Sequence, residues 1–183
     1  MLCFIVFLFV SICRKMMSVE SFQRCIESIV TISDNISDGW KLISKPEDTE
    51  NNKYILKKQI VQLKNPEDEN VQIIAHFEYH VAFSISYGVP VLCFNIWKSD
   101  GTMITLEEYW KCNTRFKEYS MYETLTQMDH PVLHQPVYTL HPCRTQEILE
   151  PFMEKSKNPI ISWLSVVGPY VQLELLEDYL KSC

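Results

Sequence analysis

Residues 71–97, VQIIAHFEYHVAFSISYGVPVLCFNIW, decide the fold of this chain. They are rich in β-branched and aromatic side chains, and Gly88 interrupts them where a turn is expected. We predict two strands, 71–87 and 91–97, joined through Gly88, Val89 and Pro90. Shorter strand-like runs at 40–43 and 54–63 precede them, with turn residues at 65–68 and 99–101. Consecutive strands without intervening helices indicate an antiparallel meander.

Helical patterns lie on both sides of these strands. Apolar residues recur at helical spacing from Ser18 to a stop at Gly39, and residues 105–108 form a capping box that opens a short helix through Lys111. Further short helices are expected at 160–167 and 173–180, whereas 113–135 is expected to be irregular. The predicted fold class is therefore α+β, an antiparallel meander with helices flanking it.

Composition limits the classes of partner. The chain has 183 residues, 46% of them hydrophobic, which is enough for one domain with a real core over residues 16–183. A formal net charge of −6 disfavours nucleic acid as a partner and points to proteins. The seven cysteines are widely spaced without a C-x-x-C pair, which favours reduced thiols and a cytoplasmic location. No cofactor is predicted.

Residues 1–15 differ from the rest. The run Leu2 to Cys13 is almost entirely apolar and ends at Arg14 and Lys15, like the hydrophobic part of a signal peptide. No positive region precedes it, and about twelve residues fall short of the roughly 20 that cross a bilayer as a helix. We expect an N-terminal extension of the domain here. A weak interfacial anchor and a true signal are the alternatives, so contact with a membrane stays open.

Cys143 is the candidate nucleophile. The strand-like segment 135–140 should end before Pro142, which cannot donate to a sheet ladder. Thr145 is the expected N-cap of a helix that follows, with apolar residues at 148, 149 and 152. The positive end of this helix and the neighbouring Arg144 would favour the thiolate, which is the reactive form. The alternative is a small buried side chain without chemistry.

Four blocks around this cysteine occur in a recognisable order. They are 78–92 with Glu78-Tyr79-His80-Val81 and Ser86-Tyr87-Gly88-Val89-Pro90-Val91-Leu92, 129–136 with Asp129-His130-Pro131-Val132-Leu133, 140–145 with Leu140-His141-Pro142-Cys143-Arg144-Thr145, and 162–169 with Ser162-Trp163-Leu164-Ser165-Val166-Val167-Gly168-Pro169. Together they resemble the autophagy-related protein ten family of ubiquitin-like-conjugating enzymes, over about residues 18–176.

The resemblance implies both a fold and a reaction. The fold would be that of ubiquitin-conjugating enzymes, and Cys143 would be the catalytic residue that accepts the modifier as a thioester. The implied modifier is autophagy-related protein twelve, delivered by the activating enzyme autophagy-related protein seven. The implied acceptor is a lysine of autophagy-related protein five, in support of autophagosome formation and the protein transport that depends on it.

Other functions stay open from the residues alone. A cysteine hydrolase would need a base, for which His141, His130 and His134 are candidates. The same fold with an inert cysteine would be a protein-binding module. For a conjugating enzyme the oxyanion donor is unassigned, because the chain lacks a His-Pro-Asn motif. The candidates are the backbone N–H groups after Cys143 and the side chains of Asn113, Tyr79 and Thr145.

Two histidine pairs and two tryptophans complete the candidates. His76 and His80 lie on a predicted strand, where residues four apart are about 13 Å from each other, too far for one zinc ion. His130 and His134 bracket a loop proline and are not excluded in that way. No metal site is predicted. Trp163 and Trp97 lie in apolar runs and are expected in the core.

Overall fold

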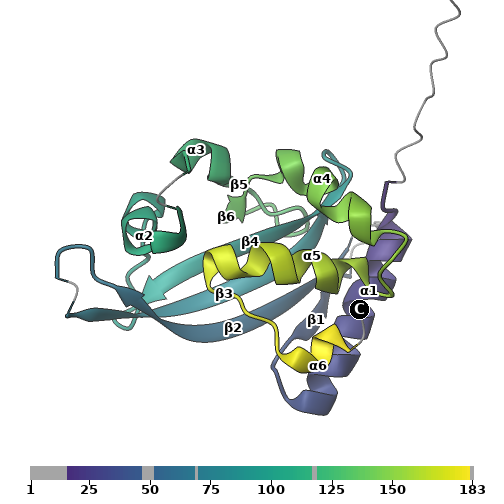
Figure 1. Ribbon diagram of the computed structural model, residues 1–183, viewed down its shortest axis with the longest axis horizontal. Coiled ribbons are helices and arrows are strands. Elements are labelled where there is room, and N and C mark those ends of the chain that lie inside the picture. The colour runs from purple at the N-terminus through teal and green to yellow at the C-terminus, as the bar shows by residue number, and fades with distance from the viewer. Residues whose placement is uncertain (1–15, 47–51, 69, 117–118, 182–183) are drawn as a thin grey trace, which may run out of the picture.

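An antiparallel sheet of six strands in the order β1-β2-β3-β4-β6-β5 forms the centre of the computed structural model, which describes residues 16–46, 52–68, 70–116 and 119–181 (Figure 1). The strands are β1 Lys41–Ser44, β2 Lys53–Lys64, β3 Gln72–Ser84, β4 Val89–Lys98, β5 Leu125–Asp129 and β6 Pro136–Leu140. The helices are α1 Val19–Ile36, α2 Leu106–Cys112, α3 Met121–Thr124, α4 Thr145–Leu149, α5 Pro159–Val167 and α6 Glu177–Leu180. The predicted extension at 1–15 lies outside the described residues.

The meander of β1 to β4 is confirmed, with one correction at its central turn. The turn is Ile85–Gly88, and Val89 and Pro90 already belong to β4. Pro90 pairs with Phe83 of β3, at a place where β6 does not reach, since β6 joins β4 only at Cys93 and Phe94. A proline is tolerated there because the outer side of the strand needs no backbone donor.

The two helical predictions before residue 113 are confirmed. Ser18 caps α1 by accepting from the backbone of Ser21, and the helix ends before Ser37 and Gly39, whose φ angles are 56° and 89°. Thr105 and Glu108 form the predicted capping box of α2. Among the helices that the structure describes, none has the length and apolar character that crossing a bilayer requires.

Two predictions near the end of the chain are wrong. The segment 113–135 contains a strand, β5, whose five residues pair with β6. The segment 173–180 is helical only over α6, because residues 173–176 alternate between buried or half-buried and exposed side chains, as an extended segment does. In both places tertiary pairing or packing outweighs the local pattern.

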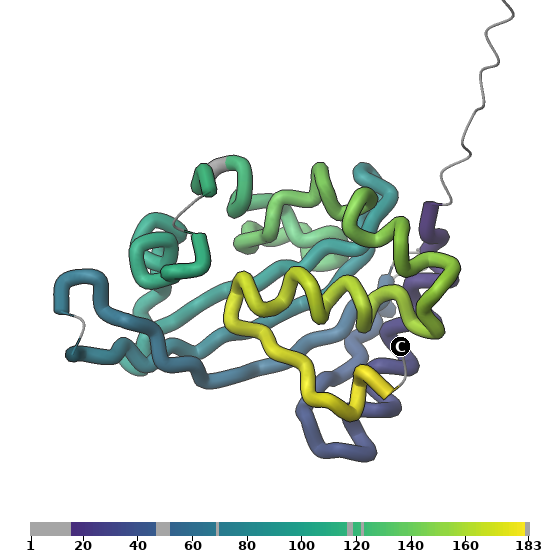
Figure 2. Tube along the Cα trace, viewed as in Figure 1, coloured from purple at the N-terminus to yellow at the C-terminus, as the bar shows by residue number. Residues whose placement is uncertain are grey.

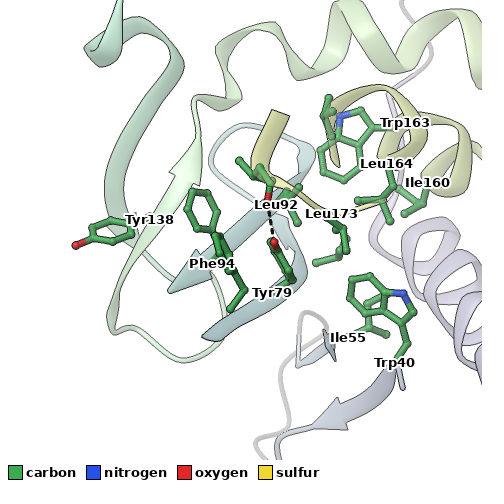
Figure 3. Packing of buried hydrophobic residues seen from close by; sticks show 14 of the residues in the cluster. Trp40, Ile55, Tyr79, Leu92, Phe94, Tyr138, Ile160, Trp163, Leu164 and Leu173 are labelled. Carbon is green, nitrogen blue, oxygen red and sulfur yellow. Dashed lines mark hydrogen bonds between the residues drawn. The ribbon is translucent and has the colours of Figure 1, made fainter. Parts of the chain in front are cut away.

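Helices α1 and α5 pack on one face of the sheet (Figures 1 and 3). Alternate residues of β2, β3 and β4 point toward them, and the resulting core includes Ile55, Tyr79, Leu92, Phe94, Ile160, Trp163, Leu164 and Leu173. Trp163 is 1% exposed, which confirms its predicted place. The prediction that Trp97 lies in the core is wrong: it is only half-buried, because it and its cross-strand partner His76 both point to the face opposite these helices.

That opposite face carries a smaller apolar cluster under the turn between β5 and β6. Val132 of the turn packs there with Tyr54, Ala82, Val91, Cys93 and Val137. The chain then ends on the helical side, where α6 packs on α1 (Figure 2). Tyr179 of α6 donates to Asp38, 141 positions earlier, and Asp38 also pairs with Lys57 of β2 at 2.6 Å. This buried ion pair joins three distant parts of the chain.

Candidate active site

The predicted nucleophile lies where β6 gives way to a turn. β6 ends at Leu140, and Pro142–Arg144 form a single 3-10 turn. His141 caps this turn, since its Nδ1 accepts from the backbone N–H of Cys143 at 3.3 Å. Pro142 is buried and Cys143 is exposed. The local sequence therefore anchors the backbone at Pro142 and leaves the next side chain at the surface.

The helix that follows differs from the prediction by one residue. Thr145 is the first residue of α4 and Arg144 is its N-cap, without a side-chain capping bond. The Thr145 side chain is buried, and its backbone N–H donates to Pro142, so the 3-10 turn runs directly into the helix. Arg144 forms an exposed ion pair with Glu147 at 3.2 Å. Its charge is thus shared with a carboxylate beside Cys143.

Cys143 lines a pocket with a volume of ≈ 730 Å³. One wall comes from α3 and the segment before it, through Tyr119, Ser120, Glu123 and Thr124. The other wall comes from α5 and the residues after it, through Trp163, Val166, Val167 and Tyr170. Leu140, His141, Arg144, Thr145 and Ile148 complete the lining. The pocket is therefore largely apolar, with polar groups from α3 and from the turn that carries the thiol.

The other described cysteines are buried or partly buried. Burial raises the pKa of the Cys93 thiol to about 12 and raises the pKa of the Cys25 and Cys112 thiols as well. These three thiols therefore stay protonated at neutral pH. Cys143 is the cysteine that the structure exposes among the four described ones.

Two of the three side chains considered as oxyanion donors serve another purpose. The Asn113 amide donates to the Tyr109 hydroxyl and to the Tyr170 carbonyl, at 3.1 and 2.7 Å. The Tyr79 hydroxyl donates to the Val171 carbonyl at 2.7 Å (Figure 3). Both side chains are buried and hold the 3-10 turn Gly168–Val171 in place. Thr145 alone among the three lines the pocket of Cys143.

The histidines proposed as bases do not gather at Cys143. His141 lines its pocket, but His130 and His134 line a second pocket of ≈ 540 Å³ together with Cys93 and Asp129. His130 is fully buried, and its Nδ1 accepts from the backbone N–H groups of Val132 and Leu133, each at 3.1 Å. Burial lowers the pKa of His130 to about 3. The structure thus gives His130 a role in the turn and not in catalysis at Cys143.

The histidine contact in the structure joins one member of each predicted pair. His80 packs against His130, with ring centroids 5.0 Å apart, and Tyr54 contacts both rings. His80 Nε2 lies 3.1 Å from Glu78. Within the described residues no group of three potential ligands is arranged to hold a metal ion. This cluster of aromatic rings was not evident from the sequence, because its members come from β2, β3 and the turn after β5.

Comparisons with known proteins agree with this geometry. A family model described as autophagocytosis associated protein, active-site domain, matches residues 21–178, a range that includes Cys143. The human ubiquitin-like-conjugating enzyme ATG10 is 40% identical over 119 residues, covering 60% of this chain and 54% of the relative. The enzyme of the same name from Dictyostelium discoideum is 32% identical over 125 residues, covering 58% of this chain and 54% of the relative. The chain spans about half the length of these curated relatives.

A solved structure confirms the fold class. The crystal structure described as autophagic E2, Atg10, superposes with a TM-score of 0.59 at 16% sequence identity, covering 87% of this chain and 99% of that chain. At such low identity the likeness concerns the fold alone. The chain therefore has the predicted α+β fold of conjugating enzymes, with an antiparallel sheet and flanking helices.

Proposed function

Because the chain belongs to the family of autophagocytosis associated proteins that share this active-site domain, we propose that it is a ubiquitin-like-conjugating enzyme with Cys143 as its catalytic residue. The observation that carries this proposal is the placement of Cys143. It is an exposed thiol, anchored by a buried proline, at the edge of a pocket large enough for an extended peptide. The family match and the named relatives support the same class of reaction.

The first half of the reaction is a thioester exchange. The Cys143 thiolate attacks the carbonyl carbon of the modifier's C-terminal residue, which an activating enzyme holds as a thioester. A new C–S bond forms, and the sulfur of the activating enzyme leaves as a thiolate. Since one thioester replaces another, the rate depends on the placement of the two reactants and on the fraction of thiolate.

The second half transfers the modifier to an amine. A lysine of the acceptor loses its proton and attacks the same carbonyl carbon, an oxyanion forms, and Cys143 leaves as a thiolate. Of the three side chains considered as oxyanion donors, Thr145 lines the pocket. The proposed partners are autophagy-related protein seven as activating enzyme, autophagy-related protein twelve as modifier and autophagy-related protein five as acceptor.

The setting of this reaction follows from the same resemblance. We place residues 16–183 in one conjugating-enzyme-like domain that works in the cytoplasm, where reduced thiols persist. The product would support autophagosome formation and the associated protein transport.

Reconstitution with activating enzyme, modifier and ATP tests the proposal. On a non-reducing gel the wild-type chain should form an adduct that thiol reductant removes. Cys143→Ser should form an adduct that resists reductant, because an alkoxide is a poorer leaving group than a thiolate. Cys143→Ala should form none, while Cys112→Ser, which replaces a buried thiol, serves as the control and should load. An adduct on Cys143→Ala would show that another residue is the nucleophile.

A further inference from the structure

β5 is an edge strand with an unused row of backbone groups. In the sheet order it is the last strand, and among the described residues it pairs with β6 alone (Figure 1). Two hydrogen bonds fix which residues face β6: His141 N–H donates to Thr124, and His130 N–H donates to Gln135. Antiparallel pairs alternate along a ladder, so Thr126 and Met128 also face β6.

The residues between them must face outward. Leu125, Gln127 and Asp129 direct their backbone N–H and C=O groups away from β6. The N–H of Leu125 is already used by Met121 of α3, but no backbone partner occurs for Gln127 or Asp129 in the part of the chain that the structure describes. Pro136 fits this alternation, because it stands opposite Asp129 in a pair that exchanges no hydrogen bonds.

This edge lacks two of the features that usually prevent strand addition. Lysine and proline commonly protect edge strands from other chains. β5 reads Leu-Thr-Gln-Met-Asp and contains neither. The opposite edge of the sheet, β1, contains Lys41 and is followed by Lys45 and Pro46.

The position of β5 relative to Cys143 indicates which kind of ligand would bind there. Leu125, at the start of β5, pairs with Leu140, only three residues before Cys143. Leu140, Thr124 and Glu123 all line the pocket of Cys143. A strand added antiparallel to β5 would run from the Asp129 end to the Leu125 end. Its C-terminus would therefore arrive beside the thiol, with about two or three further residues needed to reach Cys143.

We propose that β5 binds the extended C-terminal tail of the modifier as an added antiparallel strand and so delivers the terminal carbonyl to Cys143. This inference rests on the proposed function. The tail is the expected ligand because it ends at the reacting carbonyl, so the direction of the tail along β5 matters. An acceptor protein presents a lysine side chain from within its chain and has no such requirement. Backbone hydrogen bonds then supply affinity without depending on the tail's side chains.

Amide hydrogen exchange of the stable Cys143→Ser adduct tests the proposal without altering β5. The Gln127 and Asp129 amides should exchange at least about tenfold more slowly in the adduct than in the free chain. The Thr126 and Met128 amides, which already face β6, are internal controls and should not change. Equal exchange of Gln127 in the two states would overturn the proposal, as would protection that appears only after the acceptor is added.

A second test removes one outward donor. Gln127→Pro deletes an N–H that β6 does not use, and an edge strand tolerates proline at such a position. Single-turnover loading at limiting activating enzyme should be about fivefold slower than in the wild type. The matched control is Ser44→Pro, an outward position of β1 at the far edge, since Lys45 N–H donates to Asn52 and the ladder alternates from there. If Gln127→Pro loads like the wild type, the tail does not bind β5; if the wild type forms no thioester, the proposed function itself fails.

Discussion

His130 shows how a single side chain couples stability to pH. Burial lowers its pKa to about 3, and the neighbouring His80, His134 and Lys45 act in the same direction. The pKa of His80 is also lowered, mainly by burial. In the unfolded chain both imidazoles bind a proton near pH 6.5. Between pH 6.5 and about 3 the unfolded state therefore binds more protons, and stability must fall as the pH falls.

We expect the free energy of unfolding to be level above about pH 7 and to fall by about 3 kcal/mol between pH 6.5 and pH 4. His130→Asn should flatten much of this slope, because an amide oxygen can still accept from Val132 and Leu133 but does not titrate. Urea unfolding across that pH range measures the effect. An unchanged slope in His130→Asn would contradict the assignment.

Single residues were predictable where the signal is local. Cys143 follows a strand and a proline within a few positions, and the structure places it at the surface as those residues indicate. The roles of Asn113 and Tyr79 depend on carbonyls 57 and 92 positions away, which no local pattern reveals. The ring cluster of Tyr54, His80 and His130 is non-local in the same way.

At the scale of elements, α5 supplies one wall of the pocket of Cys143. Asn158 starts this helix by accepting from the backbone of Ile160 and Ile161, and its amide donates to the Cys25 carbonyl in α1. The side chain is 4% exposed. It therefore caps α5 and also fixes that helix against α1.

Asn158→Ala should lower the free energy of unfolding by about 2–3 kcal/mol, since it removes the cap of α5 together with the hydrogen bond between α5 and α1. Ser18→Ala, which removes the exposed cap of α1, should cost only about 1 kcal/mol. Chemical denaturation of both variants gives the comparison. Equal losses would show that the bond to Cys25 contributes nothing.

Strands were predictable where apolar and β-branched residues continue over many positions. β2, β3 and β4 are of this kind, and each is found within about two or three residues of its predicted bounds. β5 is short, and only its first residue is fully buried, so that pairing with β6 alone makes it a strand. Because the sequence pattern is equally weak over 113–135, no helix or strand is predicted there.

At the scale of the molecule, the buried pair of Lys57 and Asp38 connects the end of α1, the sheet and α6. Both side chains are less than a tenth exposed, and Tyr179 donates to the second oxygen of Asp38. Removing one member leaves a buried charge with incomplete compensation. The pair should therefore contribute more than the surface pair of Lys53 and Glu27, whose side chains are 31% and 44% exposed.

Lys57→Met should lower the free energy of unfolding by about 3 kcal/mol, whereas Lys53→Met should change it by less than about 1 kcal/mol. Urea denaturation at pH 7 measures both. The double variant Lys57→Met with Asp38→Asn should recover part of the loss, because no unpaired charge remains. A double variant as unstable as the sum of its two single variants would argue that the two residues act independently.

Gly168 begins the 3-10 turn that carries Tyr170, a residue of the pocket lining. Its carbonyl accepts from Leu173, and the Leu173 carbonyl comes so close to the Gly168 Cα that a methyl group there would collide with backbone. An alanine could be accommodated only if this backbone shifted. Because Tyr170 of the same turn lines the pocket, a methyl group at position 168 would reshape the pocket wall without touching any reacting atom.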